Sequence, residues 1–128
     1  MSFTITTHGS CFKGLGKWSY ELEYISPNRS ISFNHSDCGE ASGTTTRQMK
    51  LNAILQAVMF VKSSDFSGSV VVKSDCKWCV KCLTREYDCV SDDKFKRDKV
   101  ARGYVQFIRE IWWKIENMDV RFEIVDNQ

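Results

Sequence analysis

The chain has 128 residues, of which 42% are hydrophobic and 12% aromatic, with one proline and seven glycines. This composition predicts one globular domain over residues 1–128 and excludes a disordered or fibrous protein. Lys and Arg outnumber Asp and Glu by only 18 − 16 = 2. A nucleic-acid-binding function would therefore need basic residues clustered on one surface.

No segment of the chain predicts a membrane span or a secretory signal. No apolar run approaches the ~20 residues that cross a bilayer. The first eight residues have neither the basic nor the apolar region of a signal peptide. We therefore expect a cytoplasmic protein without a membrane partner, whose six cysteines are reduced thiols rather than a disulfide framework.

The first third of the chain predicts an antiparallel meander. Residues 2–7 and 18–24 alternate apolar and polar side chains, as strands do. Residues 8–17 contain three glycines and predict a loop. Pro-Asn at 27–28 indicates a turn, and a third short strand is expected to start at 31–33.

The remaining residues alternate between helical and strand patterns. Residues 47–62 and 103–116 carry apolar side chains at helical spacing, and 76–86 predict a shorter helix. Three valines at 70–72 indicate a strand buried on both faces, and 120–125 alternate as a strand. The order β-β-β-α-β-α-α-β predicts an α/β fold with a mixed five-stranded sheet and helices packed on it.

Three motifs in this order carry a family resemblance. The first strand runs into Thr-His-Gly-Ser-Cys at 7–11, the first long helix opens with Thr-Thr-Thr-Arg-Gln-Met-Lys-Leu at 44–51, and the buried strand ends in Ser-Asp-Cys-Lys-Trp at 74–78. With the late amphipathic helix and the final strand, these motifs make the chain similar to type 1 ribonucleases H. The resemblance extends over nearly the whole chain and implies a ribonuclease H-like fold.

The resemblance also implies an activity that the residues do not support. The family cuts the RNA strand of RNA–DNA hybrids with two divalent metal ions held by four acidic residues. Two close hard cations need several carboxylates. Here His8 and Lys50 occupy the first two acidic positions, and only Asp75 remains. The fourth acid lies in the family on a C-terminal helix, which we expect to be lacking because the chain ends at Gln128.

The remnant site formed by His8, Lys50 and Asp75 allows several interpretations. Lys50 is expected to form an ion pair with Asp75, although it could instead contact a phosphate. His8 is expected to be partly buried and hydrogen-bonded, although it could ligate Zn²⁺ or Mn²⁺ together with Asp75. We expect no metal site and no cofactor, with Mg²⁺ or Mn²⁺ required only if the chain is an active nuclease.

The cysteines at 76, 79 and 82, with Cys89 further on, have a spacing compatible with zinc. Because they fall at i, i+3 and i+6 of a predicted helix, apolar packing is the alternative.

Residues 94–102 hold five basic residues and one acid, which indicates either a solvated loop or a phosphate-binding protrusion. The resemblance places the start of the first long helix, together with an aromatic residue near Asp75, against the backbone of the bound hybrid. The predicted nucleic-acid-binding residues are Thr45, Thr46, Arg47, Gln48, Lys77, Trp78, Lys81, Lys94, Lys96, Arg97, Lys99 and Arg102.

Three functional hypotheses remain open. The first is a catalytically inactive ribonuclease H-like module that binds RNA–DNA hybrid or duplex backbone through a basic surface. The second is a protein-interaction or inhibitor module that uses the same fold. The third is a metal-dependent endoribonuclease with a rearranged site. A homodimer through the strand at 120–125 is a further expectation.

Overall fold

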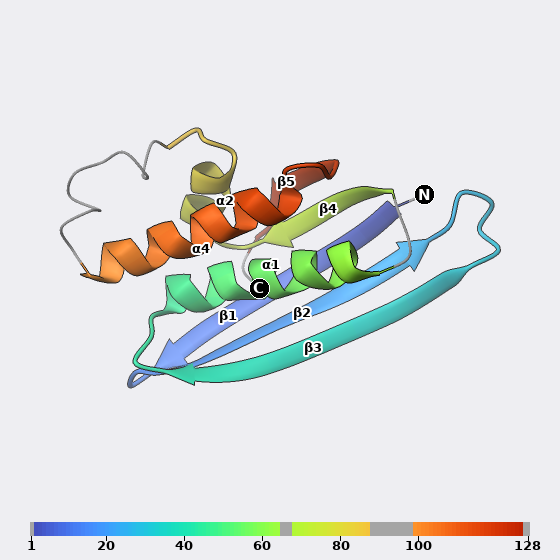
Figure 1. Cartoon of the computed structure of the whole chain (residues 1–128). Coiled ribbons are helices and arrows are strands. Elements are labelled where there is room, and N and C mark those ends of the chain that lie inside the picture. The colour runs from blue at the N-terminus through green and yellow to red at the C-terminus, as the bar shows by residue number, and fades with distance from the viewer. Residues whose placement is uncertain (1, 65–67, 88–98, 127–128) are drawn as a thin grey trace.

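The structure is a computed structural model that describes residues 2–64, 68–87 and 99–126, with the side chains of 99–102 left undescribed. These residues form five strands and three helices, which follow one another in the predicted order (Figure 1). Their bounds are β1 Ser2–Phe12, β2 Leu15–Ile25, β3 Ser32–Ser42, α1 Thr46–Ser63, β4 Ser69–Ser74, α2 Lys77–Leu83, α4 Lys99–Ile115 and β5 Val120–Ile124.

The strands form one mixed sheet in the order β3-β2-β1-β4-β5. β1 pairs antiparallel with β2, and β2 with β3. β4 runs parallel to β1, and β5 runs parallel to β4. The predicted α/β fold with a mixed five-stranded sheet is therefore confirmed. β3 and β5 lie at the two edges, and pairing of β5 with a second copy stays a prediction.

The loop predicted at 8–17 is wrong. β1 continues to Phe12 and β2 begins at Leu15, so a tight hairpin joins two strands of 11 residues each. Lys13 and Gly14 form the turn with φ values of 52° and 78°, and positive φ at both central residues suits the twist of a hairpin. Two of the three glycines serve close packing rather than a loop. A Cβ at Gly9 would lie 2.8 Å from Lys50 Cα, and one at Gly16 would lie 2.8 Å from Met49 Sδ.

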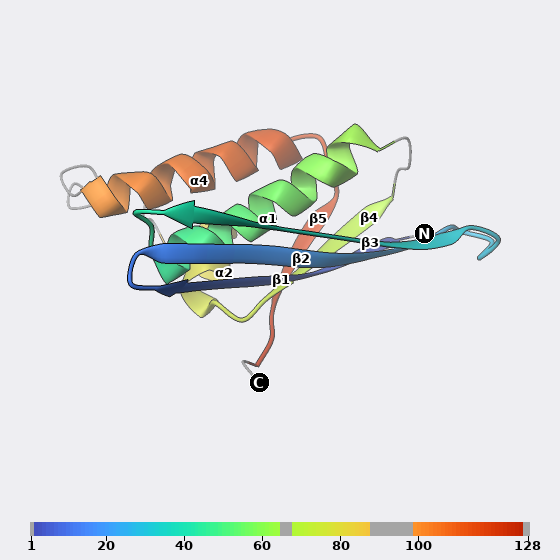
Figure 2. The same ribbon diagram turned by 90° about the horizontal axis from the view of Figure 1, so that it is seen from below.

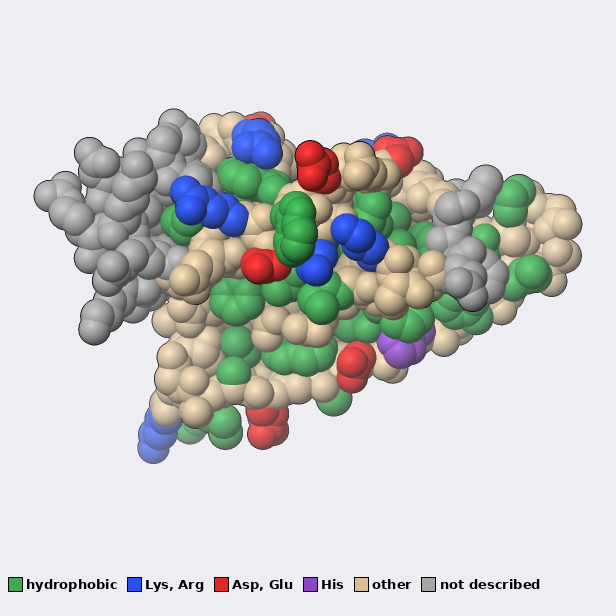
Figure 3. Space-filling view, in the orientation of Figure 1, with side chains coloured by type: hydrophobic (Ala, Val, Ile, Leu, Met, Phe, Trp, Pro, Cys, Tyr) green, Lys and Arg blue, Asp and Glu red, His purple; other side chains and the backbone are tan. Residues whose placement is uncertain are grey.

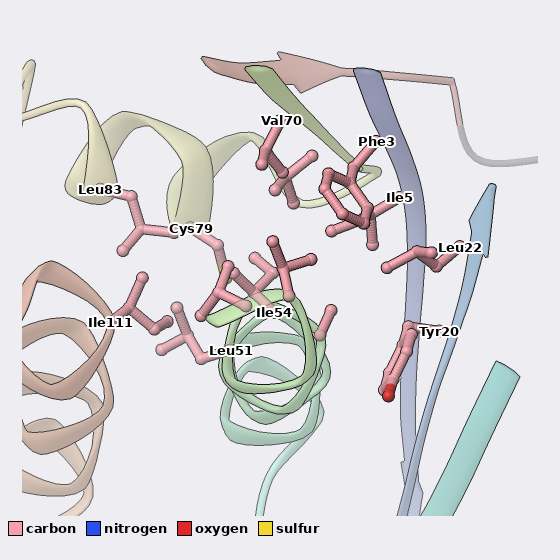
Figure 4. Close-up of a cluster of buried hydrophobic side chains, with 14 of the residues drawn as sticks. Phe3, Ile5, Tyr20, Leu22, Leu51, Ile54, Val70, Cys79, Leu83 and Ile111 are labelled. Carbon is pink, nitrogen blue, oxygen red and sulfur yellow. The ribbon is translucent and has the colours of Figure 1, made fainter. Parts of the chain in front are cut away.

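The helices pack on one face of the sheet (Figure 2). The core lies between the helices and the sheet (Figure 4). Phe3, Ile5, Leu22 and Val70 from the strands pack there against Leu51 and Ile54 from α1. The short α2 adds buried side chains to this core and ends at Leu83, before the predicted 86. The described helices leave the other face of the sheet uncovered. None of the helices among the described residues is long and apolar enough to span a membrane.

Candidate nucleic-acid interface

The start of α1, the second half of β1 and the end of β4 lie close together. The capping box between Thr45 and Gln48 fixes where α1 begins, because each residue satisfies a backbone N–H of the other. Gly9 lets β1 approach the backbone of α1 at Lys50, since no side chain stands between them. Asp75 follows the last residue of β4 directly. Lys50 and Asp75 are thus brought together from positions 25 residues apart.

The predicted ion pair between Lys50 and Asp75 is present. Lys50 Nζ donates to Asp75 Oδ1 at 2.7 Å, and the two side chains are 15% and 19% exposed. A short, charge-assisted hydrogen bond of this kind is among the strong ones when it is shielded from water. The ammonium therefore occupies the space beside the single remaining carboxylate.

His8 differs from its prediction. Gly9 faces α1, so the preceding side chain projects from the opposite face of the sheet. The His8 side chain is 54% exposed rather than partly buried, and its Nε2 lies 3.7 Å from Glu21 Oε1. The structure therefore brings Lys50 and Asp75 together but turns His8 away from them.

The residues present do not fit the pair of divalent metal ions that the family resemblance implies. Among the described residues, no group of three or more His, Cys, Asp or Glu side chains could hold a metal ion. Asp75 is the one carboxylate at the remnant site, and its nearest partner is a cation that repels Mg²⁺.

An aromatic and cationic cluster lies beside the ion pair. The Arg47 guanidinium stacks 4.5 Å from the centre of the Trp78 ring, an attractive cation–π arrangement. Trp78 meets the ring of Tyr104 edge-on at 5.3 Å, and the Tyr104 hydroxyl lies 3.0 Å from Thr45 Oγ1. The structure thus joins three predicted site residues, Thr45, Arg47 and Trp78. Tyr104 is a member of this cluster that was not predicted, because its helical spacing indicated only a core position.

The other residues at the start of α1 divide into structural and accessible ones. The Gln48 side-chain oxygen accepts from Thr44 Oγ1 at 2.8 Å and from the Thr45 backbone N–H at 3.2 Å, so it is occupied by the cap. Thr46 and Arg47 are exposed. Thr46 and Arg47 are therefore better placed than Gln48 to contact a phosphate at this end of the helix.

The two predicted lysines of α2 differ. Lys77 is exposed, and no carboxylate of the described residues lies within ion-pair distance of it. Lys81 lies 3.5 Å from Glu86 Oε2, with its side chain 24% exposed. Lys77 is therefore the freer cation. Lys94, Lys96 and Arg97 lie outside the described residues, as do the side chains of Lys99 and Arg102.

The cysteines do not support the zinc interpretation within the described residues. Cys76 and Cys79 are free thiols, as are Cys11 and Cys38. Cys82 is disulfide-bonded, which corrects the expectation that all six cysteines are reduced. Cys89 lies outside the described residues.

The two faces of the molecule differ in the charged side chains that an anion would meet. Over the described parts of α1 and α4, acidic and basic side chains lie interspersed among apolar ones (Figure 3). The uncovered sheet face carries a shallow groove whose lining includes Glu21 and Glu23. These carboxylates repel phosphates, which leaves the region around Arg47 and Lys77 as the better candidate.

No protein-family profile and no curated protein matches the chain. Solved structures share its fold. LC9-RNase H1, a type 1 RNase H with the type 2 active-site motif, is similar with a TM-score of 0.82 and 18% identity, over 99% of this chain and 64% of that chain. This chain therefore spans less than two thirds of the length of that protein.

Two further ribonucleases H are similar. The N-terminal RNase H domain of rv2228c from Mycobacterium tuberculosis, solved as a fusion with maltose binding protein, has a TM-score of 0.70 and 12% identity over 98% of this chain and 83% of that chain. RNase H1 from the halophilic archaeon Halobacterium salinarum NRC-1 has a TM-score of 0.59 and 16% identity over 97% and 86% of the two chains. The chain has a ribonuclease H-like fold.

Proposed function

We propose that this chain is a catalytically inactive ribonuclease H-like module that binds the backbone of RNA–DNA hybrid or duplex nucleic acid. The observation that carries the proposal is the 2.7 Å ion pair between Lys50 and Asp75. It stands where the family resemblance places carboxylates for metal ions. A cation in that position opposes divalent metal binding. Because Asp75 already neutralises Lys50, the exposed cations beside the pair are the ones left to bind a phosphate.

The exposed cations beside the ion pair supply the binding surface in this proposal. The ring of Trp78 restrains the Arg47 guanidinium by stacking, so less conformational freedom is lost when it binds a phosphate. Lys77, the residue before Trp78, adds a second exposed cation. Two to three phosphate contacts give a modest affinity that falls roughly 10- to 40-fold between 50 and 200 mM salt.

The test is fluorescence anisotropy of a labelled RNA–DNA hybrid titrated with the protein at several salt concentrations. Arg47→Ala and Lys77→Ala are each expected to weaken binding and to reduce the slope of log affinity against log salt by about 1. Lys62→Ala is the matched control, because Lys62 lies exposed in the last turn of the same helix α1. It is expected to leave both quantities unchanged.

Equal losses in the control and in the two site variants would contradict the proposed surface. Binding that does not weaken with salt would contradict the phosphate mechanism. Trp78→Leu separates stacking from charge, since it keeps Arg47 but removes the ring beneath it.

A second candidate function is favoured by an exposed tryptophan. Trp113 on α4 is 63% exposed and borders a groove that Leu55 and Phe107 also line. Exposed tryptophans beside grooves are frequent anchors of protein interfaces. This alternative predicts complexes that survive high salt and are lost in Trp113→Ser. Salt-tolerant co-purification that the substitution abolishes, without hybrid binding, would favour it over the first proposal.

A further inference from the structure

Two cysteines stand together at the junction of β4 and α2. The sequence Cys-Lys-Trp-Cys at 76–79 follows Ser74 and Asp75, and Cys76 is the residue that caps α2. A Cys-x2-Cys spacing at the start of a helix that follows a parallel strand is typical of redox-active dithiols. The proposed nucleic-acid function does not use either sulfur.

The geometry pairs the two sulfurs and distinguishes their surroundings. Cys76 Sγ accepts a hydrogen bond from the Cys79 backbone N–H at 3.4 Å, and the Cys79 thiol also hydrogen-bonds to it. Cys76 is partly exposed, whereas Cys79 is completely buried in the core beside Leu83 and Ile111 (Figure 4). One thiol is accessible to a reagent, and the other is accessible only to its neighbour.

We propose that Cys76 and Cys79 form a redox pair that undergoes thiol–disulfide exchange, with Cys76 as the attacking sulfur and Cys79 as the resolving one. The partner is a small disulfide or a disulfide of another protein. The contact between the two sulfurs, the exposure of one and the burial of the other carry this inference. It is independent of nucleic-acid binding.

The electrostatics at the site support the assigned roles. The hydrogen bond from the Cys79 side chain lowers the pKa of Cys76 to about 6. Burial opposes this effect, while the Cys79 backbone N–H and the charges of Lys50 and Arg47 add to it. The hydrogen bond to Cys76 and burial raise the pKa of Cys79. Cys76 is therefore largely thiolate at neutral pH, and Cys79 keeps its proton until Cys76 has reacted.

The exchange balances with the disulfide as oxidant. The Cys76 thiolate attacks one sulfur of the disulfide, forms a mixed disulfide and releases one thiolate. Cys79 then loses its proton to solvent, attacks Cys76 Sγ and releases the second thiolate. In sum, two thiols of this chain and the partner's disulfide become one disulfide of this chain and two partner thiols, so this chain loses two electrons and two protons.

The test equilibrates the full chain with reduced and oxidised glutathione in several ratios, followed by acid quenching, alkylation and peptide mapping. Trypsin cleaves after Lys77, between the two cysteines. An internal disulfide therefore links the peptides 74–77 and 78–81, with two hydrogen atoms fewer than their sum. The linked pair is expected in the wild type, with the yield rising as the glutathione becomes more oxidised.

Single variants assign the roles. Cys79→Ser and Cys79→Ala are expected to accumulate glutathione on Cys76, because no resolving thiol remains. Cys76→Ser is expected to leave Cys79 unmodified, because it is buried. Cys38→Ser is the control, since Cys38 is an exposed free thiol on β3, and it should leave the linked pair unchanged. Circular dichroism confirms that each variant is folded.

Alkylation kinetics give a second measurement. At pH 6 about half of Cys76 is thiolate, against about 0.3% of an ordinary thiol with a pKa near 8.5. The lower intrinsic nucleophilicity of a low-pKa thiolate offsets part of this difference, which leaves the alkylation of Cys76 about tenfold faster than that of such an ordinary thiol. The proposal is overturned if no glutathione ratio links the two peptides. It is also overturned if Cys79→Ser carries no more glutathione on Cys76 than the wild type does.

Discussion

Replacing Lys50 by Met removes the ammonium and keeps an unbranched side chain of similar length. The Asp75 carboxylate then stays in place, 19% exposed, without the hydrogen bond that it accepts at 2.7 Å. Exposed ion pairs contribute about 0.2–1 kcal/mol, whereas loss of one partner of a buried pair costs about 3–5 kcal/mol. Both side chains are mostly but not fully buried, so this pair lies between the two cases. We therefore expect Lys50→Met to lower the free energy of unfolding by about 1.5–3 kcal/mol. For a chain of this size that loss lowers the melting temperature by about 5–15 °C.

The assay is a double-mutant cycle measured by urea unfolding. Lys50→Met, Asp75→Asn and their combination give the coupling energy, which is expected to be at least about 1 kcal/mol. The control pair is Lys17 and Glu40, 3.9 Å apart with side chains 66% and 62% exposed, for which the coupling is expected to stay below about 0.5 kcal/mol. A Lys50–Asp75 coupling no larger than the control coupling would refute the reasoning.

Three further predictions address the site and its supporting structure. Lys50→Glu sets a second carboxylate beside Asp75, so we expect a lower melting temperature than in the wild type. Mg²⁺ at ten times its Kd should raise the free energy of unfolding of this variant by about 1.4 kcal/mol, whereas the wild type shows no Mg²⁺ effect. An equal Mg²⁺ response of both proteins would contradict this. Thr45→Ala removes the helix cap and should cost about 1–2 kcal/mol in urea unfolding, against a few tenths for exposed Thr46→Ala; equal losses would contradict the capping role. Burial raises the pKa of Tyr20 to about 12. Because a raised pKa favours the protonated form, its contribution to stability is present below pH 10 and lost as the pH rises toward 12. Tyr20→Phe should remove this loss of stability, which thermal unfolding between pH 10 and 12 measures. If the variant loses as much stability over this pH range as the wild type, other groups cause the loss.

Much of the fold could be predicted because periodicity and burial coincide. The helical stripe at 47–62 and the valines at 70–72 predicted α1 and β4, and both are present. The prediction of a loop at 8–17 was wrong because glycine occurs both in turns and at points of close packing. Gly14 supplies a positive φ for a turn, whereas Gly9 lies within a strand where a helix backbone approaches closely. Sequence alone does not separate these uses, since the second depends on a contact distant in the chain.

Only part of the candidate site could be predicted, because the rest depends on contacts between distant parts of the chain. The ion pair of Lys50 with Asp75 followed from opposite charges at positions that the resemblance places together, and it is present. His8 could not be placed, because a shift of one residue along a strand turns a side chain to the other face. Tyr104 was not predicted as a site residue, because helical spacing shows only which face of a helix is apolar. It does not show that the Tyr104 hydroxyl lies beside Thr45.

We propose that this ribonuclease H-like chain binds nucleic acid without cutting it. The most direct measurement incubates the protein with a labelled RNA–DNA hybrid in Mg²⁺ or Mn²⁺, at low and high salt, and scores retention and cleavage in the same samples. We predict retention at low salt, release at high salt and an intact RNA strand throughout. Metal-dependent cleavage that disappears in Asp75→Asn would contradict the claim.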